Sequence, residues 1–177
     1  MKTKVLNGAA NVGLFLAHAL ALEIEAAERY TELADSMEAH NNVEVAKLFR
    51  DLSTYSAKHA EEVKQIAREH GALPKVAPWE FQWDATTESP EAAAFENAHY
   101  LMKPHHALKM ALLSEHQGNN YYASVAAETK DPEVARLARE FAEEEAGHVA
   151  LVRKWLERYP APKDDWSDDP DPPNISD

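Results

Sequence analysis

"EVARLAREFAEEEAGHVALV", residues 133–152, is the second occurrence of a pattern that first appears as "EVAKLFRDLSTYSAKHAEEV", residues 44–63. The two segments align without a gap at an offset of 89 residues, which places His59 opposite His148. In both segments, apolar residues recur at the spacing of one face of an α-helix. The repeat therefore predicts two amphipathic helices that occupy equivalent places in two similar halves of the chain.

The composition favours a helical domain of ordinary size. A chain of 177 residues, 45% of them hydrophobic, can bury a sizeable core as one domain. Only five glycines occur, and no alternating run of valine, isoleucine or threonine predicts a strand. The absence of cysteine excludes disulfides, zinc ribbons, thiolate iron centres and cysteine nucleophiles. We therefore predict an all-α fold.

The net charge of −13 argues against a nucleic-acid partner, because binding to phosphates requires a basic surface. No stretch stays apolar for the ~20 residues that a membrane span needs, so no membrane partner is expected. The run "VGLFLAHAL" near the basic start of the chain is similar to a signal peptide, but Asn11 and His18 interrupt its apolar character. We expect a cytoplasmic protein.

Four long helices are predicted from apolar periodicity and from residues that start or end helices. Gly71 ends the second helix, and Asp131 and Pro132 begin the fourth. The connection at 71–103 is long, and a short helix is expected within it from Ser89. The helices are expected from Asn7 or Asn11 to Ala39, from Val43 to His70, from Pro104 to Thr129, and from Asp131 to about Tyr159.

Two short connections and one long one predict a four-helix bundle with a long crossover between helices 2 and 3. The bundle is expected to span residues 1–159, and the acidic, proline-rich tail at 160–177 is expected to be disordered. We also expect a homodimer, in which exposed apolar residues such as Phe15 and Phe95 contact the partner.

A second repeat links the first and third helices. Glu23 precedes Tyr30 by seven residues, and Glu115 precedes Tyr122 by seven residues. Because seven residues make about two helical turns, each glutamate shares a face with its tyrosine. Both faces also carry the apolar stripe of their helix, so both glutamates are expected to point into the bundle.

The inward-facing polar residues suggest a metal site. The i, i+3 pair Glu145 and His148 lies on the apolar face of the fourth helix, and His59 lies on that of the second. A buried carboxylate without a partner is costly, so three carboxylates and two imidazoles that meet in one bundle favour a bound divalent cation. Carboxylate and imidazole ligands suit iron or manganese, and zinc also accepts them. The five expected ligands are Glu23, His59, Glu115, Glu145 and His148.

At these residues the sequence resembles the ferritin-like superfamily, and within it the diiron-carboxylate domain of rubrerythrins, over most of residues 10–158. The resemblance implies a four-helix bundle that holds two irons and activates dioxygen or peroxide. It also implies that the five residues are metal ligands, and that Tyr30 and Tyr122 hydrogen-bond ligand carboxylates.

The sequence departs from the family pattern at Ser56, which stands where the family has a glutamate. This serine has three possible meanings. It leaves room for a water ligand, or Glu62, one turn beyond His59, acts as the ligand in place of the missing glutamate. In the third case the site is degenerate and holds one metal or none. The register of Glu62 matches Leu151 in the repeat, which fits a ligand poorly. We favour an asymmetric site with a weak second iron.

Two further departures bear on activity. Gly118 stands where rubrerythrins often carry an additional glutamate, and without cysteine there is no rubredoxin module, so electrons must come from an external donor. The resemblance implies peroxide or dioxygen reduction coupled to Fe(II) oxidation. The alternatives are a non-catalytic metal-binding or iron-storage accessory module, which Ser56 favours, and a purely structural bundle.

Overall fold

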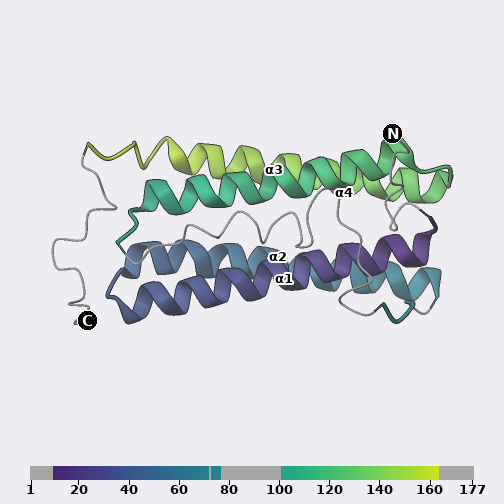
Figure 1. Ribbon diagram of the computed structural model, residues 1–177, viewed down its shortest axis with the longest axis horizontal. Helices are drawn as coiled ribbons and strands as arrows, with labels where there is room; N and C mark the ends of the chain where they lie inside the picture. The colour runs from purple at the N-terminus through teal and green to yellow at the C-terminus, as the bar shows by residue number, and fades with distance from the viewer. Residues whose placement is uncertain (1–9, 72, 77–100, 164–177) are drawn as a thin grey trace, which may run out of the picture.

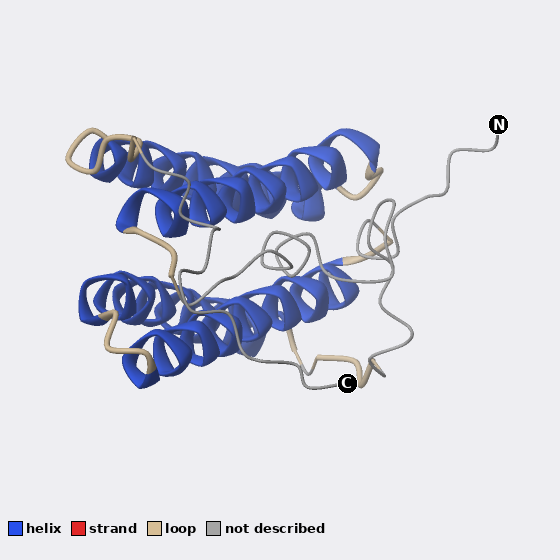
Figure 2. Cartoon of the chain, turned by 60° about the vertical axis from the view of Figure 1, so that its left-hand side comes forward, coloured by secondary structure: helices blue, strands red, loops and turns tan. Residues whose placement is uncertain are grey.

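The computed structural model describes residues 10–71, 73–76 and 101–163, and within these ranges the chain forms four α-helices and no strand (Figure 2). The all-α prediction is thereby confirmed. The helices are α1 (Val12–Ala39), α2 (Val43–His70), α3 (Pro104–Glu128) and α4 (Pro132–Leu156).

The helices form two antiparallel hairpins, α1 with α2 and α3 with α4, which lie one above the other (Figure 1). α2 and α3 run in the same direction, so the end of α2 and the start of α3 lie at opposite ends of the bundle (Figure 1). This is the predicted four-helix bundle with a crossover. The short helix expected from Ser89 and the tail beyond Lys163 lie outside the described residues.

Local sequence signals account for the helix ends. The Asn11 side chain accepts a hydrogen bond from the Leu14 N–H at 3.0 Å, and the Asp131 side chain accepts one from the N–H of Glu133 at 2.9 Å. Asn41, with φ 61°, follows the end of α1, and Gly71, with φ 105°, follows the end of α2. The boundaries therefore agree with prediction, except that α4 ends at Leu156 instead of near Tyr159.

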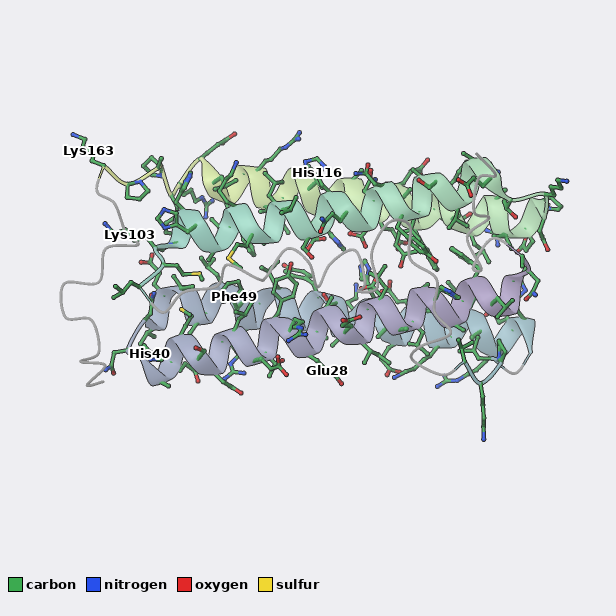
Figure 3. All side chains as sticks on the ribbon, viewed as in Figure 1. Glu28, His40, Phe49, Lys103, His116 and Lys163 are labelled. Carbon is green, nitrogen blue, oxygen red and sulfur yellow. The ribbon has the colours of Figure 1, made fainter. Side chains whose placement is uncertain are left out.

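The core consists of two apolar clusters. Phe15, Leu137 and Phe141 belong to the first, and Tyr30 and Phe49 belong to the second. Phe49 points from α2 toward the second hairpin (Figure 3). The inward-facing polar residues lie along the helices between the segments that build these clusters, so they occupy a polar layer within an otherwise apolar interior.

Two expectations about exposure are wrong. Phe15 is fully buried, and its ring stacks on that of Phe141 with the centroids 5.5 Å apart, so it offers no surface to a partner. The helical spacing of Leu52, Tyr55 and Val63 in the sequence predicts that Tyr55 lies on the buried face of α2, but Tyr55 is 42% exposed. Phe95 lies outside the described residues, and the homodimer stays a prediction. None of the described helices combines the length and the apolar character needed to cross a membrane.

Candidate metal centre

Five ionisable side chains, drawn from all four helices, meet in the polar layer of the bundle. α1 contributes Glu23, α2 contributes His59 and α3 contributes Glu115. α4 contributes Glu145 and His148, one turn apart on the same face. The three carboxylates are buried: Glu23 is 5% exposed, Glu115 is 8% exposed and Glu145 is 2% exposed. Each has therefore been removed from water.

The five groups contact one another directly. Nδ1 of His148 donates a hydrogen bond to Oε2 of Glu115 at 3.2 Å and lies 3.4 Å from Oε2 of Glu145. Nδ1 of His59 lies 3.9 Å from Oε1 of Glu23. The two imidazole rings are adjacent, with centroids 4.6 Å apart. The structure thus brings together all five residues that the sequence analysis singled out.

Two tyrosines orient the carboxylates. The Tyr30 hydroxyl donates a hydrogen bond to Oε1 of Glu115 at 3.3 Å, and the Tyr122 hydroxyl donates one to Oε1 of Glu23 at 3.4 Å. Each tyrosine therefore bonds the glutamate of the other hairpin, and not the one that precedes it by seven residues on its own helix. These two bonds join α1 to α3 at the level of the cluster.

Burial perturbs the ionisation of the cluster. Burial, with the nearby Glu145 and Glu115, raises the pKa of Glu23 well above its ordinary value. Burial likewise raises the pKa of Glu145 to about 8. Burial opposes the charged form of His148, but the hydrogen bond to Glu115 and the adjacent carboxylate of Glu145 outweigh it and raise the His148 pKa to about 10. Protons thus offset the buried negative charge when no cation does so.

The His59 imidazole responds in the opposite way. Burial, together with the neighbouring His148, lowers the pKa of His59. A neutral imidazole carries a free lone pair, which is the form that binds a metal ion.

The donor atoms fit a divalent cation. His59, Glu145 and His148 each offer a ligand atom, and these atoms lie within 4.8 Å of one another. Ligands bonded at about 2.1 Å to one ion lie up to about 4.2 Å apart, so small side-chain movements suffice to bind one. Oε2 of Glu145 is buried and accepts no hydrogen bond from the described residues. A cation would satisfy it, and nitrogen and oxygen donors of this kind suit iron or manganese.

Ser56 and Glu62 lie on either side of His59 along α2. Ser56 is half-buried, and its side chain offers a hydroxyl and no carboxylate. Glu62 forms a second potential ligand group with His59 and Glu144, again with donor atoms within 4.8 Å of one another. The sequence analysis missed Glu144, although it lies in an acidic run directly before Glu145.

Comparisons with known proteins agree with this geometry. Over residues 15–101 and 106–169 the chain matches the family model described as Rubrerythrin. It is also similar to a solved structure, that of an uncharacterised conserved protein from Magnetospirillum magnetotacticum MS-1, with 48% sequence identity and a TM-score of 0.66. The similarity covers 88% of this chain and 99% of the other. A comparison with curated proteins finds no match.

Proposed function

The chain belongs to the rubrerythrin family, which implies a diiron-carboxylate centre, and we propose that it binds iron at the cluster in the polar layer. The observation that carries the proposal is the convergence of three buried carboxylates and two imidazoles from four separate helices. Such a set is costly to bury without positive charge, and a divalent cation supplies that charge. The proposed ligands are Glu23, His59, Glu115, Glu145 and His148.

We propose that the two sides of the centre bind metal with different strength. On the side of α4, Glu145 and His148 provide a carboxylate and an imidazole from one helix face. On the side of α2, His59 is preceded one turn earlier by Ser56, which cannot supply a carboxylate. The ion beside α2 therefore has fewer anionic ligands and is held more weakly.

The proposed reaction is the reduction of peroxide or dioxygen, for which bound iron supplies the electrons. The protein orients its metal ligands, because the Tyr30 hydroxyl holds the carboxylate of Glu115 and the Tyr122 hydroxyl holds that of Glu23. The sequence has no cysteine for a rubredoxin-type centre, so an external donor is proposed to return the electrons.

A second candidate function is metal binding without turnover, as in an iron-storage accessory protein. Ser56 favours it, because a centre with one carboxylate fewer stabilises two ferric ions less well than a symmetric one. The ligands would be the same under both proposals, and only the redox behaviour would differ.

Anaerobic titration with Fe(II), followed by addition of hydrogen peroxide or oxygen, separates these functions. Two irons per chain and rapid growth of ferric absorption would support the oxidative function. A single iron that oxidises slowly would support the binding module. If the folded protein takes up no iron, the proposal of a metal centre is wrong.

A further inference from the structure

A small pocket opens between α2 and α4, next to the buried cluster. Its volume of about 40 Å³ exceeds the roughly 10–15 Å³ that one water molecule needs. Glu23 and Glu145 line its buried part, whereas the Glu62 side chain is 45% exposed and Glu144 is exposed. The remaining lining residues are His59, Val63, Ile66 and Phe141. Carboxylates therefore follow this pocket from the protein surface to the interior.

The outer part of the pocket holds the second ligand group. Donor atoms of His59, Glu62 and Glu144 lie within 4.8 Å of one another, and those of the interior group that contains His148 lie within the same limit. His59 belongs to both groups, so one imidazole can bind a cation on either side of it. The outer group therefore meets the same geometric condition for metal binding as the interior one.

The outer group exists in only one half of the repeat. At the 89-residue offset, Glu62 corresponds to Leu151 and Glu144 corresponds to Tyr55, neither of which has a carboxylate. α2 thus lacks a carboxylate three residues before His59, where Ser56 stands. It has a carboxylate three residues after His59, at Glu62. The two positions are about 9 Å apart along the helix axis, so Glu62 cannot serve the place that Ser56 left empty.

Two further observations point to a cation at this place. Glu145 lines the same pocket, and its Oε2 is buried and accepts no hydrogen bond from the described residues, although Nδ1 of His148 lies 3.4 Å from it. Glu62 and Glu144 approach each other from different helices, and two like charges so close together are stabilised by a cation between them. Lys58 pairs with Glu62 at 3.2 Å, but the Lys58 side chain is 71% exposed and that of Glu62 is 45% exposed, and ion pairs so accessible to water contribute little.

We propose that His59, Glu62 and Glu144 form an outer site for a divalent cation, from which the ion passes to the interior centre when His59 turns inward. Binding at the outer site does not depend on the interior centre, but the transfer step rests on the proposed function. The ion keeps its charge throughout, and the carboxylates on the path replace its water ligands in turn.

The test uses Mn(II) and the full chain, with bound ion measured by the loss of the free-ion EPR signal. In the variant Glu145→Gln/His148→Ala, which lacks the interior ligands of α4, one Mn(II) per chain should still bind. Adding Glu62→Gln/Glu144→Gln should weaken that binding by at least about tenfold, since even residues that only orient ligands are worth ~10–100-fold in affinity. Adding Glu61→Gln/Glu143→Gln removes the same charge from exposed neighbours and should change nothing.

Equal Mn(II) binding with and without Glu62 and Glu144 would overturn the outer site and leave the interior centre untouched. If instead the intact chain binds a single Mn(II), and that binding is lost when Glu62 and Glu144 are replaced, the outer site is supported and the proposed interior centre is wrong. Should the interior variant not fold, crystals of the intact chain soaked in Mn(II) decide the matter. An anomalous peak between His59, Glu62 and Glu144 supports the proposal, and its absence contradicts it.

Discussion

The Tyr30 hydroxyl donates a hydrogen bond to Glu115, which lies in the opposite hairpin, and the pair Tyr122 and Glu23 repeats this contact in the other direction. The two bonds have nearly equal lengths, 3.3 Å and 3.4 Å. They tie the two hairpins together at the level of the proposed metal centre. The bond from Tyr30 occupies Oε1 of Glu115, and Oε2 of the same carboxylate accepts a hydrogen bond from His148.

Replacing both tyrosines should therefore weaken metal binding. The double variant Tyr30→Phe/Tyr122→Phe removes two hydroxyls and little volume, and we expect ~10–100-fold weaker Fe(II) affinity. Each lost bond should also reduce the free energy of unfolding by about 1 kcal/mol, or ~2–4 °C in Tm. Anaerobic Fe(II) titration and calorimetry measure these effects. The control Tyr159→Phe changes a tyrosine beyond the end of α4 and should leave Fe(II) affinity unchanged. If Tyr159→Phe and the double variant bind Fe(II) with equal affinity, the orienting role is refuted.

Restoring the missing carboxylate should strengthen the weaker metal position. We expect Ser56→Glu to raise occupancy of the second iron, because it places a carboxylate one turn before His59, in the arrangement that Glu145 and His148 already have. Metal analysis after anaerobic loading measures the ratio of iron to chain. Thr54→Glu adds the same charge at an exposed position of α2 and should leave the ratio unchanged. An unchanged ratio in Ser56→Glu would contradict the asymmetric centre.

The stability of the metal-free protein should fall as pH rises. The pKa of Glu145 goes from 4.5 to about 8 on folding, and that of His148 from 6.5 to about 10. Between these limits the folded state holds more protons than the unfolded state, so each rise in pH favours unfolding. This contribution is complete below the unfolded values and is lost as pH passes through the folded ones. Thermal unfolding between pH 6 and pH 9 in the presence of a chelator should show a steadily decreasing Tm.

Metal should reverse this trend, because a cation takes the place of the protons on the buried carboxylates. At a free metal concentration of about 100 Kd, the gain is ~2.7 kcal/mol, or roughly 5–10 °C in Tm for a chain of this size. Affinity should rise with pH as the competing protons leave. A Tm that rises with pH in the metal-free protein would show that the cluster is not protonated as described.

The burial of Phe15 leads to a prediction about stability. We expect Phe15→Ala to reduce the free energy of unfolding by ~3–5 kcal/mol, because it removes a ring that packs on Phe141 and Tyr122 inside the first apolar cluster. Denaturant unfolding provides the measurement. Leu113→Ala, at a side chain that is 49% exposed, is the control and should cost much less. Similar losses in the two variants would mean that Phe15 is exposed after all.

The amino-acid sequence by itself determined the helices and most of their ends. Asn11, Asp131 and Gly71 act on the backbone within one turn, so their effect can be read locally. Periodicity also identified Glu23, Glu115 and Glu145 as inward-facing, because a polar residue on an apolar stripe has nowhere else to point. The repeat then indicated that these residues lie at one level of the bundle.

Only the tertiary structure decided which helices face each other, since that choice depends on packing over the whole bundle and not on any local pattern. It pairs Tyr30 with Glu115 across the hairpins, although sequence spacing placed that tyrosine beside Glu23. It brings Glu144 from α4 to Glu62 on α2, a meeting that neither helix encodes alone. These long-range contacts are important because the carboxylates are buried. A carboxylate removed from water is stable only when the fold places a hydrogen-bond donor, a proton or a cation beside it.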